Sequence, residues 1–599
     1  MNGTGRSRRR PGLGALAGLL AAATALGVGQ LVAGITGANG SPVVAVGQLQ
    51  IDFTPPWLKN FAISEFGSDD KLVLVSGILV VLAIFAAVIG ALATRRLAYG
   101  MVGLAVFAAV GLIAAATRPT ANFASVLPTL AATAAAVIVL RTLIGRANQP
   151  ARLGSDTGTD SWQDAWAGIE RAGPAGLDPA PPADLEPAPP AGTSPPDGLP
   201  DAPDLPAPSD LPAGVGRPPA SGSVIRPSAP RGPDWPDRLG PRHAGPQRRS
   251  FLAASAATAG VAAAAGLAGR LLAERSSVAS ARSALRIPKP VETVPGLPPG
   301  VNLDIPGLTP FVTSNNNFYR VDTAIVLPQV APSSWQLRIH GMVDREITLS
   351  FDDVLHRPLI EDWVTLCCVS NPVGGPYIGN ALWLGASLGS LLRQAGIQAG
   401  ANQLLCTSVD GFTSGTPAQV VMDGRDALLA VAMNGQPLPV AHGFPVRMVT
   451  PGLYGYVSAT KWVTDIEVTT FSQAYAYWAV RGWSQQAPIK TESRIDVPNG
   501  ESQIAAGRTA VAGVAWAQHK GIDAVHVRVD SGPWNEAELA AVPGIDTWRQ
   551  WVWYWDATPG THLIECRATD ATGYTQTGVL EPPDPNGATG YPMVQVSVG

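Results

Sequence analysis

Four long apolar stretches lie within the first 150 residues of this 599-residue chain. Each has about the ~20 apolar residues that an α-helix needs to cross a hydrocarbon layer of ~30 Å. Charged residues make up only 14% of the chain, which agrees with membrane spans. The sequence therefore predicts an all-α transmembrane bundle over residues 1–150, with spans at Leu13–Ile35, Leu72–Ala93, Leu97–Ala116 and Phe123–Leu140.

The basic residues around these stretches predict the orientation of the bundle. They precede the first span, separate the second from the third and follow the fourth: Arg6, Arg8, Arg9, Arg10, Arg95, Arg96, Arg141, Arg146 and Arg152. Because cytoplasmic loops carry an excess of Lys and Arg, both ends of the bundle are predicted to lie in the cytoplasm. None of the seven histidines lies in a span, so no haem is expected there.

The next two segments connect the bundle to the rest of the chain. Residues 151–247 are dominated by Pro, Ala, Gly and Asp, which predicts a disordered cytoplasmic linker. Residues 248–273 begin with Arg248 and Arg249 and continue as a weakly apolar Ala/Gly run. This pattern resembles a twin-arginine export signal, and it also fits a fifth transmembrane helix with basic flanks. Both interpretations place the following residues outside. Ala279–Ala281 offers a cleavage site, although we expect retention.

The chain from residue 285 onward has a globular composition. In residues 285–490, alternating runs predict strands and two capped segments predict helices, which is typical of a mixed α+β domain. These segments are Trp335–Ile339, Val446–Val449 and Trp462–Val468 as strands, and Ser350–Leu355 and Ser387–Gln394 as helices. In residues 491–599, short strands separated by turns predict a β-sandwich. One example is Ala524–Leu539, which is predicted as a strand, a Ser-Gly-Pro turn and a second strand, that is, a hairpin.

Cys367 and Cys368 stand side by side in a chain that has only four cysteines. A disulfide between neighbours is strained, and the cysteines fit neither a disulfide framework nor a zinc spacing. Neighbours on a strand point to opposite faces, so one thiol is expected to pack and the other to act. A nucleophile would need a base such as His356 or His442, and neither stands in a thiol-enzyme motif. A thiolate ligand to a soft metal fits better.

Five segments, in order, resemble the sulfite oxidase family of molybdenum enzymes. They are SNNNFYRVDTA (314–324), WQLRIHGMVD (335–344), TLCCVSNPVGG (365–375), HGFPVRMVTPGLYGYVSATKW (442–462) and ATDATGYTQ (568–576). The resemblance implies an α+β molybdopterin domain followed by an immunoglobulin-like domain, which is often used for dimerisation. It does not extend to the first 285 residues.

The resemblance also implies a molybdopterin cofactor, one per chain. In this family, one protein cysteine and the pterin dithiolene hold the metal, and the Cys-x-x-Asn spacing assigns the metal ligand to Cys368, paired with Asn371. Cys367 then packs. The cofactor phosphate calls for charge-assisted donors. The matching cofactor-binding positions are Asn316, Tyr319, Arg320, Asp322, Ser408, His442, Arg447, Ser458, Thr460 and Lys461.

Two departures from the family pattern affect the predicted substrate. Sulfite oxidases carry an arginine soon after Cys-x-x-Asn, where this chain has Pro372 and Val373. Trp483 stands where they carry a tyrosine, although a core position would suit it equally well. Arg320 matches an anion-contacting position. Cys368, Arg320 and Trp483 are therefore the predicted catalytic residues, in a pocket that is less selective for anions.

The predicted function is oxygen-atom transfer by a molybdopterin oxidoreductase on the outer face of the cytoplasmic membrane. Sulfite-type oxidation and sulfoxide reduction both remain open as the reaction. The sequence has no CxxCH haem-attachment motif, so a separate cytochrome or quinone-linked partner is expected. The net charge of −4 does not favour nucleic acid. The alternative is a cofactor-free tethered binding or scaffold protein that uses a decayed enzyme domain.

Overall fold

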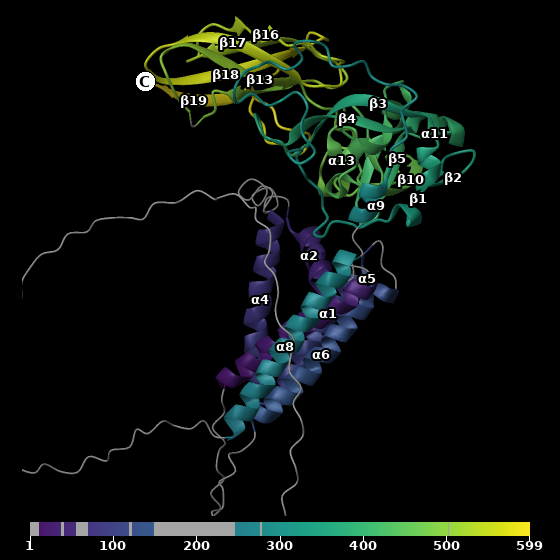
Figure 1. Cartoon of the computed structure of the whole chain (residues 1–599), viewed down its shortest axis with the longest axis vertical. Coiled ribbons are helices and arrows are strands. Elements are labelled where there is room, and N and C mark those ends of the chain that lie inside the picture. The colour runs from purple at the N-terminus through teal and green to yellow at the C-terminus, as the bar shows by residue number, and fades with distance from the viewer. Residues whose placement is uncertain are drawn as a thin grey trace, which may run out of the picture. The chain divides into compact units, whose positions relative to one another are not determined.

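The computed structural model describes residues 11–36, 41–55, 70–118, 123–148, 246–275, 278–500 and 502–599. The arginines before residue 11 and the predicted linker up to residue 245 lie outside the described residues, and the predictions made for them stay predictions. The described N-terminal residues are helical, and the residues after 285 form strands with short helices (Figure 1).

The N-terminal region contains five helices that are long and apolar enough to cross a membrane. They include the four predicted spans, and the last of these continues past Leu140 to Ala147. The fifth contains the twin-arginine-like segment. A shorter helix, α2, was not predicted. The helices are α1 (Pro11–Thr36), α2 (Pro42–Phe53), α4 (Asp70–Ala93), α5 (Leu97–Ala116), α6 (Phe123–Ala147) and α8 (Pro246–Arg275).

Helix α1 packs closely against both α4 and α8 through glycines. A Cβ on Gly18 would collide with the carbonyl oxygen of Ala86 in α4. A Cβ on Gly27 would collide in the same way with the carbonyl oxygen of Ala262 in α8. Small residues let helix backbones approach in this manner in membranes, where no hydrophobic effect drives them together. The segment predicted as a signal or a fifth span is therefore a packed member of the helix bundle.

Two sheets and four α-helices build the region between residues 330 and 470. The strand orders are β2-β1-β10-β5-β6 and β3-β4-β7-β8, with β9 paired to β7. The strands are β1 (Gln336–Gly341), β2 (Ile347–Ser350), β3 (Leu359–Cys367), β4 (Ile378–Ser387), β5 (Gln403–Ser408), β6 (Thr413–Pro417), β7 (Leu428–Met433), β8 (Gln436–Pro437), β9 (Arg447–Val449) and β10 (Val463–Thr469). The helices are α10 (Phe351–Leu355), α11 (Leu388–Ala395), α12 (Ala418–Met422) and α13 (Gly455–Ser458).

Local sequence signals explain why these elements start and stop where they do. Ser350 and Asp353 form a capping box at the start of α10, as their spacing predicts. Helix α11 begins after Ser387 and ends at Gly396, which has a φ of 72° that favours glycine. The apolar faces of β1, α11 and β7 share one core, which fixes the α+β arrangement.

The C-terminal region consists of two more sheets that enclose one core. Their strand orders are β11-β13-β17-β16 and β12-β19-β18-β14-β15. Val511 and Trp551 of the first sheet pack with Val525 and Ile564 of the second. The strands are β11 (Glu492–Val497), β12 (Gln503–Ile504), β13 (Gly507–Trp516), β14 (Ile522–Val529), β15 (Asn535–Glu536), β16 (Glu538–Leu539), β17 (Arg549–Ala557), β18 (Gly560–Asp570) and β19 (Met593–Val598).

The predicted hairpin over residues 524–539 differs from the structure in its second strand. That strand divides into β15, which pairs with β14, and β16, which pairs with β17 of the other sheet. The chain changes sheets at Ala537, whose side chain is buried in the shared core. The two-sheet arrangement agrees with the expected sandwich, and its immunoglobulin-like character stays a prediction.

Candidate functional site

The two adjacent cysteines lie at the end of β3 and have different surroundings. Cys367 is fully buried and packs in an apolar core with Tyr454 and Trp516. The sulfur of Cys368 lies 2.9 Å from the hydroxyl oxygen of Ser370. Both are free thiols. The division into one packing thiol and one thiol with a polar neighbour matches the expectation from strand geometry.

The pKa of each thiol is raised by burial, to different extents. For Cys368, the Ser370 hydrogen bonds and the nearby Lys461 ammonium oppose this effect and favour the thiolate. For Cys367, burial raises the pKa well above its usual value, and the charge of Glu492 adds to the shift. Of the two thiols, Cys368 has the stronger opposition to the effect of burial, and a metal ligand must be deprotonated.

A tight turn after Cys368 is organised by Asn371. The backbone N–H of Asn371 donates to the carbonyl of Cys368 over 3.1 Å, and its side-chain oxygen accepts from the N–H of Tyr377 over 2.8 Å. The side-chain nitrogen of Asn371 is buried without a hydrogen-bond partner. A buried amide donor left unpaired is costly in a finished protein interior, so a ligand that accepts from it would complete the turn.

Three basic side chains gather near this turn, and we call Arg320, Arg447 and Lys461 the cationic group. Asp322 accepts from Lys461 Nζ over 2.7 Å and from Arg320 Nε over 2.9 Å. Arg447 is buried and donates to three backbone carbonyls, those of His442, Met448 and Ala459. Its guanidinium also lies 5.0 Å from the centre of the Trp383 ring.

The cationic group is short of negative charge. Asp322 pairs with two of its three cations, Arg320 and Lys461, whereas Arg447 donates to backbone carbonyls. Burial lowers the pKa of Lys461 to about 8 and that of Arg447 to about 10. Such desolvated cations are stabilised by a bound anion, and planar guanidinium and ammonium donors suit a phosphate.

His442 lies beside the cationic group as a neutral ring. Its pKa is lowered to about 3. Burial is the main cause, and the positive charges of Arg447 and Lys461 lower it further. Its Nε2 is 3.1 Å from the carbonyl oxygen of Asn315, so this nitrogen carries the proton and donates. Nδ1 then remains as an acceptor. This acceptor belongs to the backbone of the residue before Asn316, whose predicted place along the cofactor stays a prediction.

Other predicted cofactor residues serve the local framework. The hydroxyl of Ser458 donates to the carbonyls of Leu453 and Tyr454 at the turn of α13. The hydroxyl of Thr460 lies 2.6 Å from that of Ser414 on β6. Ser408 accepts from the N–H of Asp410 in the β5–β6 turn. These contacts support the walls around the site.

Tyr319 and Trp483 lie in different surroundings, although both were predicted in the site. Burial raises the pKa of Tyr319 well above its usual value. The nearby Cys368 adds to this shift, and the charge of Arg447 opposes it. Trp483 packs in the core that holds Cys367, and its ring contacts Trp478 and Tyr456 edge-on at 5.9 and 6.0 Å. The structure thus brings Tyr319 close to the Cys368 thiol, while Trp483 has the contacts of a core residue.

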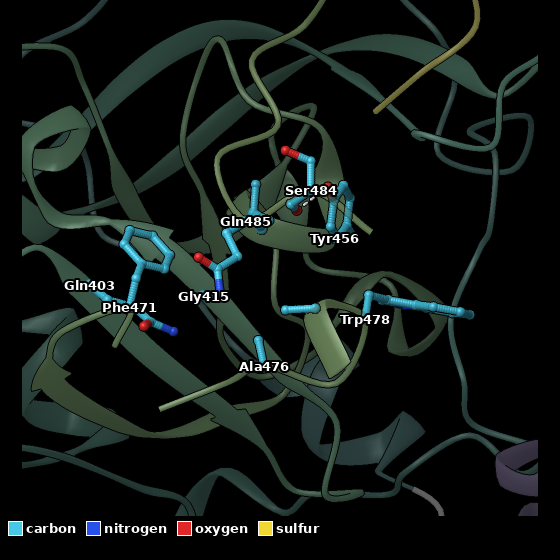
Figure 2. Close-up of a pocket in the computed structure, with 10 residues that line it drawn as sticks. Gln403, Gly415, Tyr456, Phe471, Ala476, Trp478, Ser484 and Gln485 are labelled. Atoms are coloured by element: carbon cyan, nitrogen blue, oxygen red, sulfur yellow. Dashed lines mark hydrogen bonds between the residues drawn. The ribbon is translucent and has the colours of Figure 1, made fainter. Parts of the chain in front are cut away.

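A small pocket is lined in part by Tyr456 and Trp478, the two rings that contact Trp483. Figure 2 shows Tyr456, Phe471 and Trp478 around it, together with Gln403 and Gln485. The side-chain oxygen of Gln403 is buried without a hydrogen-bond partner. None of the predicted cofactor-binding residues is among those that line this pocket. It is therefore distinct from the Cys368 site.

The residues around Cys368 fit a molybdopterin by their donor chemistry. They offer one thiol with two groups that favour its thiolate, one unpaired amide donor and a cationic group short of an anion. Within the described residues, no three His, Cys, Asp or Glu side chains gather as metal ligands. A metal bound to Cys368 would therefore take its other ligands from a cofactor.

Comparison with known proteins agrees with this chemistry. A family model described as an oxidoreductase molybdopterin binding domain matches residues 324–478. Sulfite oxidase of Gallus gallus is 29% identical over 325 residues, covering 45% of this chain and 69% of the relative. The uncharacterized oxidoreductase YuiH of Bacillus subtilis is 32% identical over 151 residues, covering 25% of this chain and 73% of the relative. The chain belongs to the sulfite oxidase family of molybdopterin-dependent oxidoreductases.

Further matches show how far the similarity extends. Mitochondrial sulfite oxidase of Homo sapiens is 29% identical over 272 residues, and this chain covers 49% of its length. The chain thus spans about half of the mammalian relative. The crystal structure of the sulfane dehydrogenase SoxCD from Paracoccus pantotrophus aligns with a TM-score of 0.43 and 21% identity, covering 48% of this chain and 82% of that chain. The predicted family and the enzyme class are confirmed.

Proposed function

We propose that the protein is a membrane-anchored molybdopterin oxidoreductase that transfers an oxygen atom to or from a sulfur compound outside the cytoplasm. The observation that carries this proposal is that the Cys368 thiol and the cationic group occur at one site, where the charge of Lys461 acts on the thiol. One supplies a metal ligand, and the other supplies the counter-charge for a cofactor phosphate. The molybdopterin-binding family supports the cofactor.

Each part of the proposed site has a task that its surroundings explain. Cys368 is the metal ligand, and Ser370 and Lys461 help it lose its proton. Arg447 and Lys461 hold the cofactor phosphate, and Asn371 donates its unpaired N–H to the cofactor. Bound there, the molybdenum cofactor supplies two-electron oxygen-atom transfer. His442 stays neutral at physiological pH, so it offers the cofactor an acceptor nitrogen without adding charge.

The substrate side of the proposed site is less cationic than a dedicated anion site. Pro372 is exposed and Val373 is half-buried in the turn after Cys368. Arg320 is the exposed member of the cationic group, and its charge is shared with Asp322. A neutral sulfoxide or a thioether-type sulfur therefore suits the entrance better than a doubly charged anion, which would lose solvation without a matching pair of cations.

The proposed location follows from the helices. The five long apolar helices are compatible with anchoring in a membrane. The basic residues that flank the spans support a cytoplasmic position for both ends of the first four, and α8 then carries the chain across once more. Retention of α8 as an anchor agrees with its close packing on α1. A separate cytochrome or quinone-linked partner would exchange electrons, and the two-sheet C-terminal region would supply a homodimer contact.

The test is the molybdenum and pterin content of the full chain, purified in detergent from a host that makes molybdopterin. Cys368→Ser and Cys367→Ser are matched variants of neighbouring buried thiols. We expect wild type and Cys367→Ser to hold metal with a thiolate-to-metal absorption band, and Cys368→Ser to lose that band. A wild-type protein without pterin and metal would overturn the proposal and favour the tethered binding module.

A further inference from the structure

The connector that follows α8 is docked on the catalytic region. Val278 is buried in the core that also holds Phe318 and Trp383, and its backbone N–H donates to the side-chain oxygen of Gln329 over 3.2 Å. The short helix α9 (Ala279–Ala284) follows immediately. Within it, Arg282 is half-buried. The connector therefore makes specific contacts with the domain that it precedes.

Arg282 binds the backbone of a distant segment in a forked geometry. Its Nε donates to the carbonyl of Leu438 over 2.7 Å, and its Nη2 donates to the carbonyl of Pro437 over 2.8 Å. Both distances are short for hydrogen bonds from nitrogen, as expected for a charged donor. A planar guanidinium reaches two successive carbonyls at once, which fixes the direction of the segment that follows.

The next carbonyls of the same segment accept from residues of the proposed cofactor site. The carbonyl of Val440 accepts from Trp462 Nε1 over 3.2 Å, and that of Ala441 accepts from Lys461 Nζ over 3.1 Å. The carbonyl of His442 accepts from Arg447 Nη1 over 3.1 Å. The segment 437–442 is thus held at its start by the connector and at its end by the cationic group.

We propose that Arg282 is a positioning residue for the cofactor site, because it holds the 437–442 segment against which Lys461, Arg447 and His442 are aligned. The inference rests on the proposed function in one respect, namely that the cationic group binds the cofactor phosphate. It extends the site to a residue in the membrane-side connector. Residues 278–284 and the cofactor site then form one connected structure.

The same contacts argue for retention of the anchor. Cleavage after Ala281 would remove Val278 from the core and would unwind the helical turn that presents Arg282. The side chains of Ala279–Ala281 are exposed, but their backbone is helical. Residues 278–284 therefore belong to the catalytic domain, and a soluble fragment that begins at residue 285 would lack part of it.

The experiment uses the full chain in detergent, with the variants Arg282→Ala and Arg282→Lys and the control Arg286→Ala. Arg286 is exposed and stands four residues further along the same connector. Two quantities are measured on each protein. The first is hydrogen exchange of the backbone amides of Leu438, His442 and Gly443, and the second is the rate at which pterin is released, followed by its fluorescence.

For Arg282→Ala we expect both rates to rise by roughly tenfold, because hydrogen bonds from a charged donor contribute about one factor of ten in an equilibrium constant. Arg282→Lys should be intermediate, since an ammonium cannot match the fork. Arg286→Ala should behave as wild type. Unchanged exchange in Arg282→Ala, or faster exchange with wild-type pterin release, would overturn the inference. A wild type without pterin would overturn the proposed function instead.

Discussion

The catalytic region and the C-terminal β region neutralise their basic side chains differently. In the β region, each of three cations has a carboxylate of its own: Arg528 with Glu565 at 2.7 Å, Arg494 with Asp496 at 2.6 Å and Lys520 with Asp570 at 3.1 Å. In the catalytic region, Arg320 and Lys461 share the carboxylate of Asp322, and Arg447 donates to backbone carbonyls.

In the β region, carboxylates of the same chain neutralise these cations. In the catalytic region, neutralisation of Arg447 would need a bound anion. A buried cation without a counter-ion is destabilising, so a ligand from outside the chain would stabilise both Arg447 and the unpaired Asn371 amide. The ion pairs of the β region need nothing further, and they hold strands and turns together. Four predictions break or sharpen this contrast, beginning with the largest expected effect.

Replacement of Arg447 by Met should abolish stable cofactor retention. The guanidinium is buried and is one of two buried cations that face the proposed phosphate, so its loss should speed pterin release by about a hundredfold, as for a charged hydrogen-bonding partner of ~3 kcal/mol. The measurement is the rate of pterin release from the purified full chain. Arg528→Met is the control from the β region, and it should release pterin at the wild-type rate.

Glu492 extends the comparison to an acidic side chain. Its carboxyl is buried, and one of its oxygens has no hydrogen-bond partner. Burial raises its pKa to about 8, whereas in the unfolded chain the carboxyl ionises near its ordinary pKa of 4.5. The unfolded state therefore binds fewer protons between these values, and stability falls as pH rises from about 4.5 to 8. Glu492→Gln should increase the free energy of unfolding at pH 7.5 by about 2 kcal/mol.

Denaturant unfolding of the wild type and Glu492→Gln at pH 7.5 and pH 4 checks this prediction. The gain should disappear at pH 4, where both states of the wild type carry the proton. Glu565→Gln supplies the opposite case, because it breaks a complete ion pair and should destabilise the protein at pH 7.5. An equal loss of stability in both variants would contradict the prediction for Glu492.

Lys461 should make anion binding depend on pH in the alkaline range. Burial lowers its pKa to about 8, so the ammonium loses its proton as pH rises through this value. Affinity of the metal-free protein for inorganic phosphate should then fall by up to about tenfold per pH unit above 8, because one proton is coupled to binding. Titration calorimetry between pH 7 and pH 10 measures it. Lys461→Arg should lack this decline, since a guanidinium stays charged.

Arg528 should show the smallest effect. Its pair with Glu565 is bidentate but partly exposed, so Arg528→Met should lower the free energy of unfolding by no more than about 1 kcal/mol. A double-mutant cycle with Glu565→Gln measures the coupling between the two side chains. A loss of several kcal/mol would show that the β region also depends on buried charge, and the contrast between the two regions would fail.

Short-range patterns in the sequence predicted much of the fold. Apolar length identified the helices, and the Ser350–Asp353 spacing identified the capping box of α10, because both depend on neighbouring residues. Strand alternation predicted that Cys367 and Cys368 point to opposite faces and therefore have different surroundings. The division of the predicted second strand into β15 and β16 was missed, since pairing with β17 is a long-range choice that alternation does not encode.

The candidate site was predictable as a set of residues and only partly as a set of contacts. Motif resemblance selected Arg447, Lys461 and Asp322, and the structure pairs Lys461 with Asp322 across 139 positions of sequence. It could not show that Ser458 donates to the backbone of its own turn, or that the carbonyl of Asn315 contacts His442. Such assignments depend on which face each side chain presents once the sheets have packed.

The sequence by itself determined the long apolar helices, the α+β and all-β division and the family, because these follow from local apolar patterns and from motif order. Only the tertiary structure decided that Arg282, in the connector after α8, shares one backbone segment with Arg447 and Lys461. Hydrogen bonds to carbonyls leave no trace in residue type, since every residue has a carbonyl. Partners of that kind become visible only when the folded chain brings them together.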